Sequence, residues 1–161
     1  MTDIMDLSRE VLERLQGKTL VTAESLTGGG IGAALTGIPG ASAVYKGGVI
    51  SYTNEVKKSL LGVPEEILQR YGAVSMWTAG YMSSGVRELL KADYAVSVTG
   101  LAGPGGDEFG HSVGTVFIGY CSKRNSIAKQ YHFSGDREAI RQQTIAAALE
   151  LILEQTQDLK R

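Results

Sequence analysis

The residues best suited to chemistry gather in and beside the stretch from Tyr45 to Val63, which reads YKGGVISYTNEVKKSLLGV. Tyr52 is predicted to end a strand, and Lys57 follows about one turn into the next predicted helix. Ser42 stands at a glycine turn that leads into the same strand. A serine and a lysine, with a tyrosine that assists proton transfer, are a known arrangement for amide hydrolysis. Spacing alone favours a simpler interpretation, in which all three are ordinary surface or turn residues.

A lysine must lose its proton before it can act as a base, and its ordinary pKa of about 10.4 lies far above neutrality. Burial or a neighbouring positive charge lowers that pKa. The two histidines, His111 and His132, are poorly placed for a serine–histidine–aspartate triad, and the chain has no G-x-S-x-G motif. A hydrolase built from this chain therefore needs another base, and Lys57 is the candidate.

A second polar group lies in the segment TAESLTGGG, where a predicted strand gives way to a helix. Glu24, Ser25 and Thr27 stand there beside Gly28 and Gly29. Hydroxyls and free backbone N–H groups at such a point can bind an anion. The glycine run also satisfies the dinucleotide pattern G-x-G-x-x-A, but the acidic residue expected about 20 positions later is missing. We therefore discount a dinucleotide site, and no P-loop sequence is present.

Two arginines, Arg137 and Arg141, stand four residues apart at the start of the last predicted helix. They share a helix face beside the positive end of the helix dipole. Such a pair suits a phosphate group, with the N–H groups of Ser134 and Gly135 as further donors. A salt bridge to Glu138 or to another acidic residue explains the same pair equally well.

Composition excludes several other functions. Net charge is −1, with hydrophobic residues at 43% and charged residues at 20%, so we expect a soluble globular protein without a nucleic-acid partner. The single Cys121 rules out an intrachain disulfide and lacks metal-ligand spacing with the histidines, so we predict no metal and no cofactor. The charged N-terminus is not a signal peptide, and the apolar run IAAALELIL is too short to span a bilayer. We therefore expect a cytoplasmic protein without a membrane partner.

Apolar periodicity and turn residues divide the chain into alternating helices and strands. Strands are predicted at residues 19–23, 43–52, 93–100, 114–122 and 126–133. Helices are predicted at residues 4–16, after the glycine run, at 55–61 with Asn54 as cap, from Pro64, from Ser75 to Leu90 and after Asp136. This order predicts an α/β fold with three α/β/α layers, in which the sheet is mixed, mostly parallel and extended by an antiparallel hairpin. The length suits a single domain over residues 1–161.

Seven segments in order resemble the C-terminal domain of the competence-damage-induced (CinA) proteins, a family that includes stand-alone nicotinamide-mononucleotide amidohydrolases. They are TAESLTGG, PGASAVYKGGVISYTNEVK, LGV, GAVS, ADYAVSVTGLAGPGG, VGTVFIG and FSGDREAIR. The resemblance covers nearly the whole chain. The family often has a cysteine where Leu26 stands and a lysine–proline pair where His111 and Ser112 stand.

The resemblance implies metal-free hydrolysis of nicotinamide mononucleotide to nicotinate mononucleotide and ammonia, in pyridine nucleotide salvage. It implies a Ser42 nucleophile assisted by Lys57 and Tyr52. The pocket residues that it implies are Ser25, Thr99, Gly100 and Arg137. Gly28, Gly29 and Arg141, singled out above from their positions in the sequence, complete the predicted substrate-binding set. It also makes a homo-oligomer, a dimer or larger, the expected assembly.

A second hypothesis remains open at this point. The chain could be a non-catalytic nucleotide-binding or protein-interaction module that acts in competence or recombination. The presence of Ser42, Tyr52 and Lys57 together favours the enzyme, because a module that only binds has no need of all three.

Overall fold

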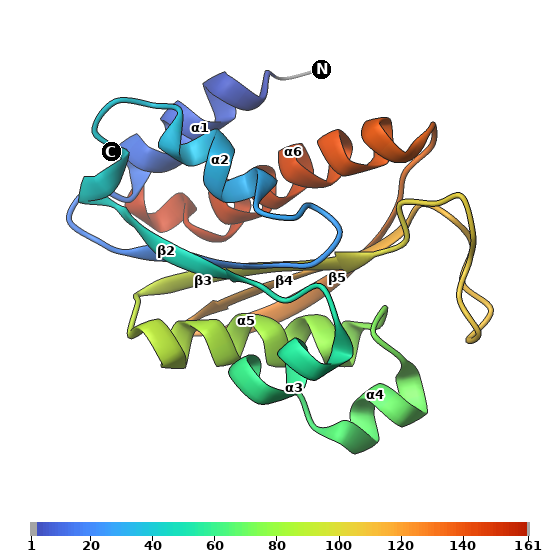
Figure 1. The fold of residues 1–161 in the computed structure, drawn as a ribbon. Coiled ribbons are helices and arrows are strands. Elements are labelled where there is room, and N and C mark those ends of the chain that lie inside the picture. The colour runs from blue at the N-terminus through green and yellow to red at the C-terminus, as the bar shows by residue number, and fades with distance from the viewer. Residues whose placement is uncertain (1–2, 161) are drawn as a thin grey trace.

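A five-stranded sheet separates two layers of helices (Figure 1). The structure is a computed structural model and describes residues 3–160. The strands are β1 (Leu20–Glu24), β2 (Tyr45–Ile50), β3 (Tyr94–Gly100), β4 (Thr115–Ser122) and β5 (Ser126–His132). The helices are α1 (Ile4–Arg14), α2 (Gly30–Thr36), α3 (Asn54–Leu61), α4 (Glu65–Tyr71), α5 (Met76–Leu90) and α6 (Arg137–Gln155), with short 3-10 helices η1 (Ala41–Ala43) and η2 (Gln157–Leu159).

The strand order is β2-β1-β3-β4-β5. β1 pairs in parallel with β2 and β3, while β4 runs antiparallel to both β3 and β5. The predicted three-layer fold with a mixed sheet and an antiparallel hairpin is confirmed. Glu24, Ile50 and Val98 stand in register where the three parallel strands end. We call this end of the sheet the carboxyl edge.

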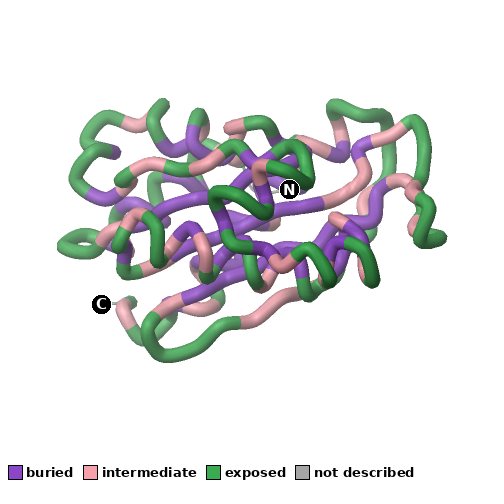
Figure 2. Tube along the Cα trace, turned by 60° about the horizontal axis from the view of Figure 1, so that its bottom comes forward, coloured by how far each residue is buried: buried purple, intermediate pink, exposed green. Residues whose placement is uncertain are grey.

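Different helices cover the two faces of the sheet. α1, α2 and α6 cover one face, and α3, α4 and α5 cover the other (Figure 1). Side chains of a strand point alternately to its two faces. In β1, Leu20 packs into the core cluster with α1, α2 and α6, whereas Val21 and Ala23 pack into the cluster with α3, α4 and α5. The central strands are accordingly buried along much of their length (Figure 2).

Helix α3 begins one residue earlier than predicted. Thr53 is its N-cap, because the Thr53 hydroxyl accepts from the Val56 N–H at 3.3 Å, and Asn54 is the first helical residue. Ser75 and Asp136 cap α5 and α6 as predicted, each accepting from the N–H group three residues ahead. These caps satisfy N–H groups that the first helical turn leaves free.

Cys121 lies buried in β4, as its apolar surroundings in the sequence predicted. Among residues 3–160, no helix combines the length and the apolar character that crossing a bilayer requires.

The close contact between α5 and α3 gives a test of the fold. A Cβ atom added at Gly85 would overlap the Leu61 carbonyl oxygen, whereas nothing lies within 4 Å of a Cβ added at Gly80 in the same helix. We expect Gly85→Ala to lower the free energy of unfolding by about 1–3 kcal/mol through overpacking. Gly80→Ala should raise it by about 0.5–1 kcal/mol, because alanine favours a helix interior. Chemical denaturation measures both, and equal effects would contradict this contact.

Candidate active site

The turn after β1 carries the first component of the site. The Ser25 N–H donates to the Val98 carbonyl at 3.1 Å, so Ser25 is still held by the sheet at the carboxyl edge. Its own carbonyl accepts from the Gly28 N–H at 3.1 Å, which closes a four-residue turn. The alternation along β1 sends the Ser25 side chain to the same face as Val21 and Ala23, which is the face that α3 and α5 cover.

Lys57 on α3 reaches this turn from that face. The residue is 1% exposed, and its Nζ lies 2.9 Å from Ser25 Oγ. Nζ also donates to the carbonyls of Ser51 at 2.7 Å and Tyr52 at 3.2 Å. Helical side chains lean toward the helix N-terminus, so a lysine in the second turn of α3 can reach the carbonyls that precede the helix. The structure therefore brings together a hydroxyl and an amine that stand 32 positions apart.

The surroundings of Lys57 favour its neutral form. Burial lowers the pKa of the Lys57 amine from 10.5 to about 8. Within residues 3–160, no carboxylate forms a salt bridge with it. At pH 7.5 a pKa of about 8 leaves about a quarter of the amine neutral, against about one part in a thousand at the ordinary value. The neutral amine keeps two N–H groups, which can stay on the two carbonyls while its lone pair points to Ser25.

Ser42 requires a correction, because the structure does not bring it to Lys57. It is exposed in η1, before β2, whereas Tyr52 and Lys57 follow the far end of that strand. A strand advances about 3.3 Å per residue, so the six residues of β2 separate its two ends by roughly 20 Å. Proximity in sequence was a poor guide here. The alternation within β1, applied to TAES, is the signal that would have selected Ser25.

Tyr52 contributes its backbone to Lys57 and its side chain to another group. The carbonyl is the acceptor for Lys57, while the phenol is 59% exposed. Arg137 Nη2 donates to the phenol oxygen at 3.3 Å, and Arg137 Nη1 donates to the Gly103 carbonyl at 2.5 Å. Arg137 thereby ties α6 to the end of β2 and to the glycine-rich loop, and the phenol that was predicted to relay a proton has its hydrogen bond with Arg137.

Glu24 occupies the helix end that the sequence offered to an anion. Its carboxylate is 2% exposed and faces α2, opposite to Ser25. It accepts from the N–H groups of Ile31 at 2.8 Å and Gly32 at 3.0 Å, and from the hydroxyls of Thr27 at 2.7 Å and Thr22 at 3.1 Å. The chain's own carboxylate thus fills the place of a bound phosphate, which explains why the glycine pattern makes no dinucleotide site.

The remaining predicted pocket residues have structural partners. Thr99 is buried and its hydroxyl donates to the Ala73 carbonyl at 2.7 Å. Gly100 lies so close to β4 that an added Cβ would stand 2.8 Å from the Thr115 carbonyl oxygen. Gly28 and Gly29 have positive φ values of 59° and 100°, which favour glycine in this turn.

Arg141 is likewise occupied by the chain itself. Nε donates to the Leu26 carbonyl at 2.9 Å, and Nη2 donates to the Thr27 carbonyl at 3.1 Å. Nη1 pairs with Glu138 Oε2 at 3.1 Å, which is the salt bridge that the sequence left open. Leu26 itself is 4% exposed and packs in the core.

Hydrogen bonds between Asp107 and His111 organise the loop between β3 and β4. Asp107 Oδ2 lies 2.8 Å from His111 Nδ1, and Asp107 Oδ1 accepts from the N–H groups of Phe109 and His111. Burial acts to raise the pKa of Asp107, but these contacts outweigh it and lower the pKa. His111 therefore serves to shape this loop.

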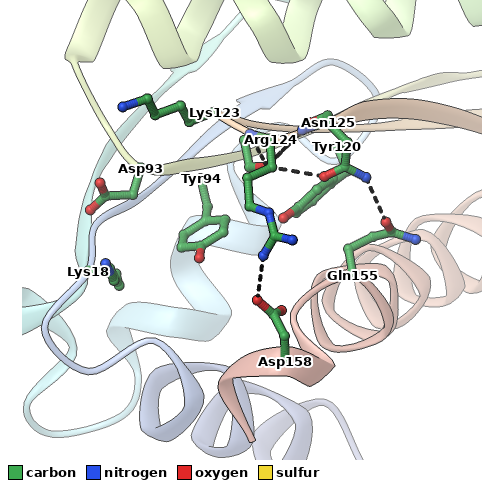
Figure 3. Close-up of a pocket in the computed structure, with 10 residues that line it drawn as sticks. Lys18, Asp93, Tyr94, Tyr120, Lys123, Arg124, Asn125, Gln155 and Asp158 are labelled. Carbon is green, nitrogen blue, oxygen red and sulfur yellow. Dashed lines mark hydrogen bonds and ion pairs between the residues drawn. The ribbon is translucent and has the colours of Figure 1, made fainter.

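A separate hollow of about 560 Å³ lies at the opposite edge of the sheet (Figure 3). Arg124 pairs there with Asp158 at 3.0 Å, and Asn125 donates to Gln155 at 3.2 Å. Among its lining residues, no hydroxyl is hydrogen-bonded to a buried amine. The carboxyl edge is therefore the candidate active site.

The chain is similar to proteins of one known family over most of its length. The family model described as the CinA C-terminal domain matches residues 4–156. The nicotinamide-nucleotide amidohydrolase PncC of Escherichia coli (strain K12) is 42% identical over 160 residues, which are 96% of this chain and 97% of that protein. A CinA-like protein of Endomicrobium trichonymphae is 48% identical over 135 residues, or 84% of this chain. The chain spans about a third of the length of such CinA-like relatives.

Solved structures show the same fold. A CinA superfamily protein from Klebsiella pneumoniae 700603 has a TM-score of 0.94 at 33% identity, covering 98% of this chain and 99% of that one. The competence/damage inducible protein CihA from Agrobacterium tumefaciens has a TM-score of 0.92 at 38% identity, covering 100% of this chain and 98% of that one.

The environment of Lys57 gives the prediction for this site. We expect its amine to titrate near pH 8, because burial disfavours the charged form. Nuclear magnetic resonance of protein labelled with ¹³C at lysine Cε measures this directly, and the Lys57→Arg spectrum identifies the resonance by its loss. A Lys57 signal that shows no change between pH 6 and 9.5 would contradict the lowered pKa.

Proposed function

The chain belongs to the CinA C-terminal domain family, whose match extends over residues 4–156, and from this premise we propose that it hydrolyses the amide of nicotinamide mononucleotide. The products are nicotinate mononucleotide and ammonia, in pyridine nucleotide salvage. The observation that supports this most is the 2.9 Å contact between Lys57 Nζ and Ser25 Oγ, with the amine buried and its pKa lowered to about 8. The similarity to the nicotinamide-nucleotide amidohydrolase PncC of Escherichia coli supports the choice of substrate.

Ser25 is the proposed nucleophile and neutral Lys57 the proposed base. Lys57 takes the Ser25 hydroxyl proton while Oγ bonds to the amide carbon. The tetrahedral intermediate then breaks its C–N bond, and the Lys57 ammonium returns the proton so that ammonia leaves. A water molecule attacks the resulting ester, Lys57 takes its proton, and Ser25 departs and recovers that proton as nicotinate forms. The carbonyls of Ser51 and Tyr52 hold the amine in place throughout.

The amide N–H of Leu26 is the proposed oxyanion donor. It follows the nucleophile directly, and within the described part of the chain it has no recorded hydrogen-bond partner. The Ser25 carbonyl of the same peptide unit is fixed by Gly28, so the direction of this N–H is fixed as well. A donor oriented before the reaction stabilises developing negative charge without reorganising.

Arg137 is the proposed phosphate ligand. The N-terminus of α2 is filled by Glu24, and that of α6 is capped by the Asp136 carboxylate, so neither helix end is free for an anion. Arg137 is exposed beside Tyr52, close to the carbonyls that hold Lys57. A guanidinium that now donates to a neutral phenol and a carbonyl gains energy by donating to a phosphate instead.

The identity of the nucleophile is testable with two serine variants. We expect Ser25→Ala to lower kcat by at least about 10³-fold, because a covalent route has no substitute hydroxyl. Ser42→Ala should stay within about twofold of the wild type, because it removes only an exposed hydroxyl. Ammonia release measures both, and acid quench with peptide mapping locates the nicotinoyl adduct. An adduct on Ser42, or an active Ser25→Ala protein, would reject Ser25.

The phosphate contact is testable by comparing nicotinamide mononucleotide with nicotinamide riboside, which lacks the phosphate. Arg137→Ala should weaken binding of the nucleotide by about 10–100-fold, the usual value of a charge-assisted contact, and leave the riboside unchanged. Tyr52→Phe is the matched control, since it removes one partner of the guanidinium and keeps the charge. Equal losses for both ligands would mean that Arg137 only ties segments together.

A further inference from the structure

We propose that Arg141 is a positioning residue for the nucleophile, which acts by fixing the peptide units that follow Ser25. This inference rests on the proposed function, because it takes Ser25 to be the nucleophile. It replaces the sequence-based hypothesis in which Arg141 holds the substrate phosphate. All three guanidinium nitrogens already donate to the protein, two of them to consecutive backbone carbonyls of the turn.

Three consecutive backbone carbonyls of the turn each accept a hydrogen bond. The Ser25 carbonyl accepts from Gly28, and those of Leu26 and Thr27 accept from Arg141. A peptide unit is planar, so fixing its C=O also fixes the N–H on its other side. Three consecutive peptide units are therefore held, and none can rotate alone. The first unit carries the Leu26 N–H and adjoins the Ser25 Cα, and the two units that Arg141 holds follow it directly.

The turn after β1 packs against helix α6, which supports it. Arg141 and Ile145 are one turn apart on α6; Arg141 lies against Gly28 in the turn, and Ile145 lies against Gly30 at the start of α2. A Cβ added at Gly28 would lie 3.7 Å from Arg141 Nη2, and one added at Gly30 would lie 2.6 Å from Ile145 Cδ1. The turn thus rests directly on a 19-residue helix that is buried along one side.

The contacts of Arg141 with the turn can be tested separately from its ion pair with Glu138. Glu138 is exposed and meets only Nη1, so it can be changed without touching the contacts to Leu26 and Thr27. A phosphate ligand and a positioning residue also differ in what they affect. Loss of a phosphate ligand raises KM for the nucleotide alone, whereas a misplaced nucleophile lowers kcat for any substrate.

The experiment compares Arg141→Ala and Arg141→Lys with Glu138→Gln. Sulfonylation of Ser25 by phenylmethanesulfonyl fluoride is the first measurement, because this probe has neither amide nor phosphate. Oγ bonds to sulfur, fluoride leaves, and Lys57 takes the proton. We expect Arg141→Ala to slow labelling by about 10–100-fold, as displacement of a reacting group by about 1 Å does. Arg141→Lys, which cannot reproduce the paired contacts, should also be slow, and Glu138→Gln should stay within about twofold.

Turnover of the mononucleotide and the riboside is the second measurement. Arg141→Ala should lower kcat for both by the same factor with little change in KM, and added guanidinium ion should restore part of the lost rate. Circular dichroism shows whether each variant is folded, and Arg141→Lys serves if the alanine variant is not.

Normal labelling in both Arg141 variants, or a KM increase for the nucleotide alone, would overturn the inference. If the wild-type protein is labelled at Ser25 but releases no ammonia, the proposed function is rejected and the positioning role of Arg141 stands. If Ser25 of the wild-type protein resists labelling, both the proposed function and the positioning role are rejected.

Discussion

The site depends on one buried amine that has no acidic partner among residues 3–160. Lys57 is 1% exposed, and its contacts are two carbonyls and a hydroxyl. A buried ammonium without a carboxylate is costly, and the cost appears as a lowered pKa. The fold makes this tolerable by providing neutral acceptors that serve the amine in both protonation states. A carboxylate in the same place would favour the charged form and remove the base.

A second buried charge lies on the other side of the same strand. Glu24 and Ser25 are adjacent in the chain, and the alternation of side chains along β1 sends them to opposite faces. Glu24 orders the start of α2 through two backbone N–H groups and two hydroxyls. The sheet keeps this carboxylate and the amine in separate layers, so the one builds the turn while the other remains free to exchange a proton.

Sequence reasoning predicted the layers, the hairpin and most helix caps, and it singled out Lys57, which lies buried beside Ser25 and is proposed here as the base. Those features follow from local rules of periodicity, capping and exclusion of histidine. It selected Ser42 over Ser25 because it weighed distance along the chain, although an extended strand carries its two ends far apart. The contacts of Arg141 could not have been read from the sequence, because their acceptors are backbone carbonyls, which every residue possesses. The contact of Tyr52 could not be read from the sequence for a related reason, since its backbone carbonyl is the group that meets Lys57.

Two of the three groups that hold the Lys57 amine belong to the main chain, at Ser51 and Tyr52. Mutation of those side chains leaves the carbonyls in place, so the position of the Lys57 amine does not depend on which side chains stand there. A change at Tyr52, whose phenol is 59% exposed, would affect the contact with Arg137 and not the carbonyl that holds Lys57. The proposed proton transfer therefore requires two particular side chains, Ser25 and Lys57, whereas the acceptors that hold the amine are present whatever side chains stand at positions 51 and 52.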